Sequence, residues 1–320
     1  MRTKTIIFLA LICILFTTTS CDLRREALGS EKNPIVFYFL PLKGAEAFNN
    51  NAPLFEKFIK EKAGLVIKAV EAPDFIATIK ALGKKKADIA FMNTLGYLLA
   101  HDWAKAEAHL IPLYGDVYSS YRGEIIVRAD SKIDKLSDLG GKTIAFADPY
   151  STGGYLYPLK LLHEHNVKPA KTVFAGGHKK AVEMLYDKEV DAAAVYHTKP
   201  SDEGFARDAR MEIADLHPDV ISKIKILALT DEIPNGPVAT RYDLPDDVRV
   251  KLIGALMEFA RTPEGRKALL DLYNITGLAI ARDAEYDSVR KTLKELNKTT
   301  QEVVPGGISF YRTWIVPGLE

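Results

Sequence analysis

A stretch of hydroxyl and glycine residues in the middle of the chain contains the residue types of an oxyanion site. It reads Asp-Pro-Tyr-Ser-Thr-Gly-Gly-Tyr over residues 148–155 and follows the short apolar segment 143–147, which is typical of a buried strand. Pro149 ends that strand, and Ser151 and Thr152 are residue types that begin helices. A helix N-terminus offers free backbone N–H groups and a positive dipole end to an anion, and glycines allow a ligand to approach closely. The residues predicted to hold a small oxyanion are therefore Ser151, Thr152, Gly153 and Gly154.

A second turn of the same kind follows another short strand. Asn93 and Thr94 come directly after the apolar segment 87–92 and open a helix in which Tyr97 lies one turn in. Short apolar strands alternate with amphipathic helices over most of the chain, which indicates βαβ units with parallel strands. Ligand sites in such folds lie at the carboxyl ends of strands, so we expect the second turn to face the first across a cleft.

The element pattern divides the folded chain into two α/β units, about 34–117 and 118–230. The chain after residue 231 is mostly helical and has too few strands to form a sheet of its own. We therefore expect lobe 1 to combine 34–117 with 231–320, and lobe 2 to span 118–230. Two lobes joined by two crossing segments make a clamshell.

Two local predictions concern the segments that border the cleft. Residues 41–51 read as a loop before a helix at 53–62. The return strand 224–229 is expected to end there, because two prolines follow within the segment 231–237.

The first twenty residues read as an export signal. Two basic residues precede an apolar run, Ile6–Phe16, that is too short to span a bilayer comfortably. Small polar residues then lead to Cys21, which resembles the site at which bacterial lipoproteins are cleaved and lipid-modified, although Thr18 stands where Leu is usual. We interpret 1–20 as a signal peptide and 21–33 as a lipidated tether, which anchors the protein at the membrane facing the periplasm or the cell exterior.

Composition and charge narrow the possible partners. The chain has 320 residues, with 43 Lys and Arg against 42 Asp and Glu, for a formal charge of +1. Removing the signal peptide takes away two basic residues and no acids, so the charge becomes −1. With no basic run beyond Lys84–Lys86, nothing favours a nucleic-acid partner. Cys13 lies within the apolar run of the signal and Cys21 is the predicted lipid site, so the exported domain must rely on its core instead of disulfides. We expect a monomer without a cofactor.

Beyond these local patterns, the sequence resembles a known family. Residues 146–158 look like the Asp-Pro-x-Ser-Thr-Ser-Gly-Tyr-x-x-Pro signature of ABC-transporter binding proteins for phosphonate, phosphite or phosphate. Residues 176–178 and 189–192 resemble that family's later Gly-Ser-His and Gly-x-Val-Asp-Ala segments, and the likeness covers about 35–260. The resemblance implies an α/β, two-lobed type II binding-protein fold. It also implies a non-enzymatic protein that captures a phosphorus oxyanion and delivers it to an ABC permease.

The resemblance also implies a set of ligand-binding residues. A protonated imidazole at residue 178 near neutral pH would favour a charged ligand. Two positions depart from the family pattern, since Gly153 replaces its third hydroxyl residue and Phe75 replaces a Tyr found in many relatives. These departures leave the identity of the anion open. By position in this sequence, the ligand-binding residues are Ser151, Thr152, Gly154, His178 and Tyr97, to which the second turn adds Asn93 and Thr94.

Four alternatives to this function follow from the sequence alone. An enzyme is disfavoured, because His163 and His165 do not share a helical face and neither His-Glu-x-x-His nor Gly-x-Ser-x-Gly occurs. The same fold could serve a receptor as a sensor subunit, or bind a larger organic anion. It could also bind ferric iron, for which the candidate ligands are Tyr118, Tyr121, Tyr155, Tyr157, Tyr196 and His197.

Overall fold

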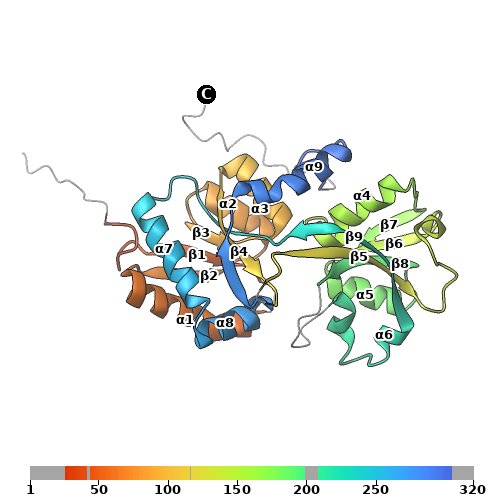
Figure 1. Cartoon of the computed structure of the whole chain (residues 1–320), viewed down its shortest axis with the longest axis horizontal. Coiled ribbons are helices and arrows are strands. Elements are labelled where there is room, and N and C mark those ends of the chain that lie inside the picture. The colour runs from red at the N-terminus through yellow and green to blue at the C-terminus, as the bar shows by residue number, and fades with distance from the viewer. Residues whose placement is uncertain (1–25, 42–43, 116, 199–207, 305–320) are drawn as a thin grey trace, which may run out of the picture.

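The computed structural model describes residues 26–41, 44–115, 117–198 and 208–304, and these form two bodies, each built on its own sheet (Figure 1). We call the six-stranded sheet with its helices lobe 1 and the five-stranded sheet with its helices lobe 2. The α/β class and the two-lobed clamshell expected from the sequence are confirmed. The residue boundaries at 117/118 and 230/231 stay a prediction. The expected signal peptide and Cys21 lie outside the described residues.

Lobe 1 has the strand order β11-β4-β10-β3-β1-β2. The pairs β1–β2 and β1–β3 are parallel, whereas β10 and β11 pair antiparallel with their neighbours. The sheet is therefore mixed, which differs from the purely parallel units that the sequence predicted. Its strands are β1 (Ile35–Phe39), β2 (Ile67–Glu71), β3 (Ile89–Phe91), β4 (Glu107–Leu113), β10 (Val238–Thr240) and β11 (Gly277–Ile280).

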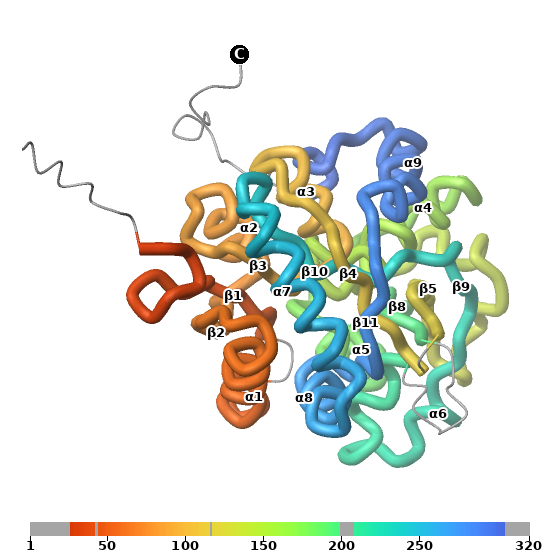
Figure 2. The backbone as a smooth tube through the Cα atoms, turned by 60° about the vertical axis from the view of Figure 1, so that its left-hand side comes forward, coloured from red at the N-terminus to blue at the C-terminus, as the bar shows by residue number. Residues whose placement is uncertain are grey.

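The helices of lobe 1 come from both ends of the chain. Helices α1, α7 and α8 pack together against the sheet, as the turned view shows (Figure 2). Phe37 and Phe39 of β1, Phe55 of α1 and Phe259 of α7 are fully buried between them, so helices from the C-terminal part of the chain pack on the sheet of lobe 1. The helices are α1 (Ala45–Ala63), α2 (Phe75–Gly83), α3 (Thr94–Ala104), α7 (Asp246–Phe259), α8 (Pro263–Tyr273), the 3₁₀ turn η4 (Asp283–Tyr286) and α9 (Asp287–Glu295).

Lobe 2 has the strand order β7-β6-β8-β5-β9. Strands β7, β6 and β8 are parallel, and β5 pairs antiparallel with both β8 and β9. Its strands are β5 (Ser120–Arg128), β6 (Thr143–Phe146), β7 (Lys171–Phe174), β8 (Ala192–His197) and β9 (Ile224–Pro234). Its helices and helical turns are η1 (Leu136–Leu139), η2 (Thr152–Leu156), α4 (Tyr157–Glu164), α5 (His178–Tyr186), η3 (Ala209–Ile213) and α6 (Val220–Lys223).

Two crossing segments join the lobes, one from β4 to β5 and one from β9 to β10. Asn235, in the second segment, donates from Nδ2 to Pro112 O at 2.8 Å and to Tyr118 O at 3.2 Å. Its own backbone N–H donates to Ser119 O at 2.8 Å. Because Asn235 is almost fully buried, these bonds fix the two crossings to each other.

Three segments differ from the sequence-based predictions. The first helix begins at Ala45 and includes Pro53, because Phe48 packs edge-on against Phe39 and tertiary burial holds the early turns. Strand β9 continues to Pro234, which pairs with Ser120 at the end of the ladder, where a missing N–H costs little. Residues 26–33, expected as a tether, form a turn in which Gly29 O accepts from Val66 N.

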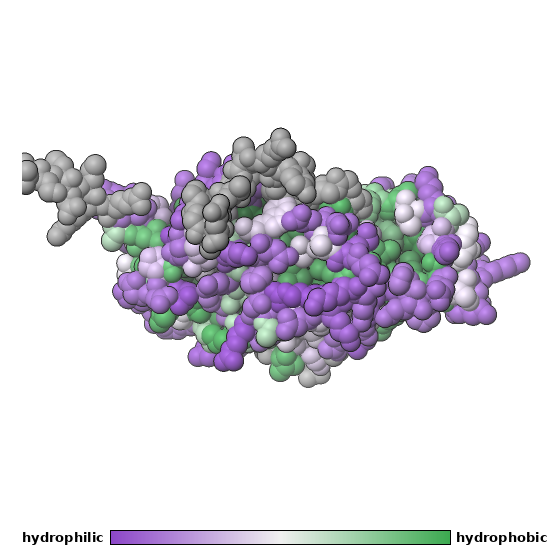
Figure 3. Space-filling model, turned by 90° about the horizontal axis from the view of Figure 1, so that it is seen from above, coloured by the Kyte–Doolittle hydropathy of each residue, from purple (hydrophilic) through white to green (hydrophobic). Residues whose placement is uncertain are grey.

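Seen from above, hydrophilic residues cover most of the face and hydrophobic ones form small patches between them (Figure 3). No helix within the described ranges has the length and apolar character needed to cross a bilayer.

Two aspartates, Asp88 buried and Asp191 half-buried, hold the starts of the inner strands. Asp88 Oδ2, just before β3, accepts from Val36 N at 2.8 Å, and Asp191 Oδ2, just before β8, accepts from Thr143 N at 2.9 Å. Asp88 Oδ1 also accepts from Arg241 Nε at 2.8 Å, and the two side chains are only 8% and 12% exposed. These contacts give both aspartates a structural role.

The Asp88–Arg241 pair yields a stability prediction. Replacing Arg241→Met leaves the Asp88 carboxylate buried without its cation, so the free energy of unfolding should fall by about 3 kcal/mol. Urea unfolding followed by circular dichroism measures the change. The control is Lys85→Met, which breaks the more exposed pair with Asp243 and should cost less than about 1 kcal/mol. Equal losses in the two variants would contradict the role given to the buried pair.

Candidate functional site

The two turns singled out in the sequence meet at the junction of the lobes. Asn93 begins α3, where its Oδ1 accepts from Gly96 N at 2.8 Å, and its Nδ2 donates to Tyr150 O of lobe 2 at 3.0 Å. Thr152, the first residue of η2, accepts at Oγ1 from Leu95 N at 3.1 Å. Two helices from different lobes therefore begin within one hydrogen bond of each other. The structure thus brings Asn93 and Thr94 together with Ser151 and Thr152.

The Ser151 hydroxyl is oriented by two donors. It caps η2 by accepting from Gly154 N at 2.9 Å, and His178 Nε2 lies 3.3 Å from the same oxygen. A hydroxyl oxygen has two lone pairs and one proton. Since both lone pairs face donors, the Ser151 proton is left to donate to a third group. A hydroxyl held in this way is chemically able to donate its proton to an anion.

His178 is held as a neutral ring. Its Nδ1 accepts from Tyr196 N at 3.2 Å, so the neutral ring carries its proton on Nε2, which faces Ser151. The ring also lies edge-on to Tyr196, with centroids 4.9 Å apart. Burial lowers the pKa of His178 to about 4. The sequence-based expectation of a protonated imidazole near neutral pH is therefore wrong, because the surroundings disfavour the charged form.

Two glycines are required by close packing at the turn. A Cβ on Gly154 would lie 2.6 Å from Ala147 Cβ and 2.8 Å from His178 Cε1. A Cβ on Gly153 would lie 2.7 Å from Tyr121 Cε2. The side chain missing at Gly153 is thus replaced in space by the ring of Tyr121.

Tyr121 is a site residue that the sequence analysis did not select as an oxyanion ligand. Its hydroxyl lies within hydrogen-bonding reach of the side chains of Thr152 and Thr94, and burial raises its pKa, so the phenol stays protonated. No local sequence signal marks Tyr121, because its place at the site depends on the packing of β5 beside η2. The period-two alternation of a strand places Tyr121 on the same face as Gly123, whose added Cβ would lie 2.3 Å from Gly153 O.

The remaining predicted residues have other hydrogen-bond partners. Thr94 donates from Oγ1 to Pro234 O at 2.7 Å, which ties α3 to the end of β9. Tyr97 is fully buried and donates from its hydroxyl to Asp283 Oδ1 at 2.8 Å. Its contact with a ligand stays a prediction.

Two of the residues proposed for a ferric site pack against aromatic rings. Tyr155 packs edge-on against Phe146 and Phe174, whereas Tyr196 lies against His178. One group of metal-type ligands occurs within the described ranges, formed by Glu124, His197 and Asp208. Arg210 donates to both carboxylate oxygens of Asp208, so its guanidinium already provides a positive charge beside this group.

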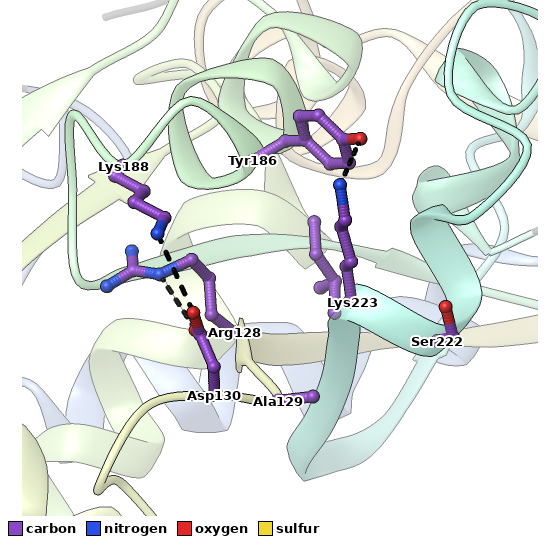
Figure 4. A pocket seen from close by; sticks show the side chains of 8 residues that line it. Arg128, Ala129, Asp130, Tyr186, Lys188, Ser222 and Lys223 are labelled. Carbon is purple, nitrogen blue, oxygen red and sulfur yellow. Dashed lines mark hydrogen bonds and ion pairs between the residues drawn. The ribbon is translucent and has the colours of Figure 1, made fainter.

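A separate hollow lies at the far end of lobe 2, where β5 ends and β9 begins. It has a volume of about 350 Å³ and a partly basic lining (Figure 4). Arg128 Nε and Lys188 Nζ lie 3.3 Å and 3.7 Å from Asp130, and Lys223 Nζ lies 2.8 Å from Asp219. Because these cations are compensated by neighbouring carboxylates, the hollow is a poorer anion site than the meeting point of the two turns.

The neutral state of His178 makes stability depend on pH. An unfolded histidine has a pKa near 6.5, and the folded value is about 4, so between these values the unfolded chain binds more protons. The contribution of His178 to the free energy of unfolding is complete above pH 6.5 and is lost as the pH falls to 4. The slope reaches about 1.4 kcal/mol per pH unit for each such histidine. Burial and nearby Arg249 likewise lower the pKa of His109 to about 4, so two residues contribute.

We expect His178→Gln to remove one of these two contributions. Urea unfolding of the ligand-free protein at several pH values between 4 and 6.5 should give a slope lower than that of the unaltered chain by up to about 1.4 kcal/mol per pH unit. His163→Gln, on the exposed face of α4, is the control and should retain the full slope. An unchanged slope in His178→Gln would contradict the burial of a neutral ring at this position.

Comparison with known proteins identifies related chains. The family model for the phosphonate periplasmic substrate-binding protein of ABC transporters matches residues 37–286, which is more than half of the chain. The phosphonates-binding periplasmic protein of Escherichia coli is 26% identical over 282 residues, covering 80% of each protein. A phosphate-import protein of Mycolicibacterium smegmatis is 24% identical over 258 residues, covering 73% of this chain and 77% of that protein.

A solved structure shares the fold. The binding-protein component of an ABC phosphonate transporter from Pseudomonas aeruginosa superposes with a TM-score of 0.66 at 23% identity, covering 82% of this chain and 87% of that one. The relatives are substrate-binding proteins and not enzymes, which confirms the expectation of binding without catalysis. The chain belongs to the family of periplasmic substrate-binding proteins of ABC phosphonate transporters.

Proposed function

We propose that this chain captures a small phosphorus oxyanion where the two turns meet and delivers it to an ABC permease. The observation that carries the proposal is the meeting of two helix N-termini from different lobes, at Leu95 N and Thr152 Oγ1, beside an oriented Ser151 hydroxyl. Such an arrangement presents donors and positive dipole ends to one point. Family membership supplies the transport context.

The proposed ligand contacts are hydrogen-bond donors without a formal charge. They come from the Ser151 and Tyr121 hydroxyls, the first N–H groups of η2 at Thr152 and Gly153, and the Nε2–H of His178. Phosphonate, phosphite and phosphate share three oxygens that accept such bonds. Neutral donors hold an anion without a full cationic cage, so release to a permease stays possible. Asn93 and Thr94 complete the site from lobe 1, which lets ligand binding favour lobe closure.

The names of two relatives indicate the chemical class of the ligand. The Escherichia coli protein is named for phosphonates and the Mycolicibacterium smegmatis protein for phosphate import. We assign the common oxyanion group as the recognised part and leave the substituent on phosphorus to experiment.

Calorimetry tests the assignment directly. The exported chain from residue 22, unfolded and refolded to remove carried ligand, is titrated with phosphite, phosphate, methylphosphonate, 2-aminoethylphosphonate and sulfate. At least one phosphorus oxyanion should bind with a dissociation constant of about 10 μM or tighter. Ser151→Ala should weaken that binding by about tenfold or more, because a hydrogen bond to a charged group is lost.

The matched control uses the same cap chemistry at another helix. Thr262 Oγ1 caps α8 of lobe 1 by accepting from Gly265 N at 3.0 Å, three residues ahead, as Ser151 does for Gly154. Thr262→Ala should cost about 1 kcal/mol of stability and leave binding unchanged. Absence of binding by every phosphorus oxyanion would reject the proposal.

We further propose that Cys21 is lipid-modified and anchors the exported protein. This proposal rests on the sequence pattern before Cys21 alone. Cys21 itself lies outside the described part of the chain. In bacteria expressing the full chain, the unaltered protein should be recovered with membranes and take up labelled fatty acid. Cys21→Ala should lose the label. Labelling that persists in Cys21→Ala would refute the assignment of this residue.

A further inference from the structure

The C-terminal helix α9 is attached to lobe 1 through α3 and the second crossing segment. Ahead of α9, Asp283 accepts from Tyr97 of α3, and the ring of Tyr286 lies against that of Tyr97 with centroids 4.7 Å apart. The Tyr286 hydroxyl donates to Asn235 O at 3.0 Å, in the segment that crosses between the lobes. The start of α9 is thus fixed on the helix whose N-terminus forms half of the proposed site.

The other contacts of α9 reach lobe 2. Lys160 Nζ on α4 lies 2.7 Å from Asp231 Oδ2 of β9, 3.2 Å from Glu164 Oε1 on α4 itself and 3.5 Å from Glu295 Oε2 at the end of α9. The Lys160 side chain is only 12% exposed, so water screens these pairs less than at an open surface. Tyr157, also on α4, is buried with its hydroxyl within hydrogen-bonding reach of Ser288 and Thr292 of α9.

These contacts join the same two helices that meet at the site. Helix α4 continues directly from η2, which carries Thr152, and α3 begins at the Asn93 turn. In both Figure 1 and Figure 2, α9 lies close to α4, with which it is in contact. Neither Glu295 nor Tyr157 is among the proposed ligand donors. A change in these contacts therefore alters how the lobes are held and leaves the donors in place.

We propose that α9 is an interlobe strap, which stabilises the arrangement in which the two turns meet and thereby raises the affinity of the site for its oxyanion. This inference rests on the proposed function for its effect on affinity. Its effect on lobe arrangement is independent of any ligand. A measurement of lobe arrangement and a measurement of oxyanion affinity can therefore contradict the proposal independently of each other.

The first test compares two charge reversals around one lysine. Glu295→Lys places a like charge opposite Lys160 across the lobes, whereas Glu164→Lys does so within α4, at a similar distance. For the ligand-free chain from residue 22, small-angle X-ray scattering should give a larger radius of gyration for Glu295→Lys and an unchanged one for Glu164→Lys. Equal radii for Glu295→Lys and the unaltered chain would overturn the strap, whether or not any oxyanion binds.

The second test measures affinity. Titration with inorganic phosphate and methylphosphonate should show binding weakened about threefold or more in Glu295→Lys and unchanged in Glu164→Lys. Most of the difference should vanish at 1 M NaCl, where the screening length is about 3 Å. An equal change of affinity in both variants, or tighter binding in Glu295→Lys, would contradict the proposal that α9 raises the affinity for the oxyanion.

A variant without a charge change distinguishes the loss of α4–α9 contacts from a general effect of added charge on anion binding. Tyr157→Phe removes the hydroxyl that reaches Ser288 and Thr292 and keeps the ring. It should weaken binding in the same direction, with little dependence on salt. Thermal unfolding checks that each variant is folded. A folded Tyr157→Phe with unaltered affinity and unaltered radius of gyration would show that these contacts do not hold the lobes.

Discussion

The structure depends on one electrostatic constraint, the close approach of two helix N-termini from different lobes. Leu95 N and Thr152 Oγ1 are 3.1 Å apart, and the helices that begin there both direct their positive ends towards the junction. Each N-terminus carries about half an elementary charge. At about 5 Å and an effective dielectric constant of about 20, two such charges repel by on the order of 1 kcal/mol. Surrounding contacts must hold this arrangement together.

Hydrogen bonds between the lobes supply part of that support. Asn93 spans the junction to Tyr150, and Asn235 fixes the two crossing segments to each other from a buried position. Tyr121, from the first crossing strand, fills the space over Gly153 and places its hydroxyl beside Thr94 and Thr152. A larger residue at Gly153 would displace this ring, so the glycine and the tyrosine act as one unit. The departure of Gly153 from the family pattern thus has a local structural reason.

The parts of the site that are local in sequence could be predicted from it. Asn93 and Ser151 are cap residues directly after short strands, and both cap their helices through a side-chain oxygen. The fold class followed from the alternation of strands and helices. Residue types and spacing carry this information because caps and periodicity depend on neighbours within a few positions.

What sequence reasoning missed depends on contacts between distant segments. Tyr121 joins the site only because β5 lies beside η2, and the charge state of His178 depends on a backbone donor 18 residues away. Strand β10 has only three residues and gains its pairing from β3 and β4, far earlier in the chain. The start of α1 depends on the packing of Phe48 on Phe39 in a neighbouring strand. None of these partners is visible in a short sequence window.

An anion between the two N-termini would reverse the sign of the central interaction. Each half charge attracts a unit negative charge at about 4 Å by about 2 kcal/mol at the same dielectric constant. The repulsion between lobes then becomes attraction of both lobes to one ligand. His178 need not be charged for this, since its Nε2–H is a donor in the neutral ring. In the ligand-free protein, the contacts of α9 with α4 oppose the repulsion between the two helix N-termini. The stronger these contacts are, the less of the ligand's binding free energy is needed to bring the lobes together.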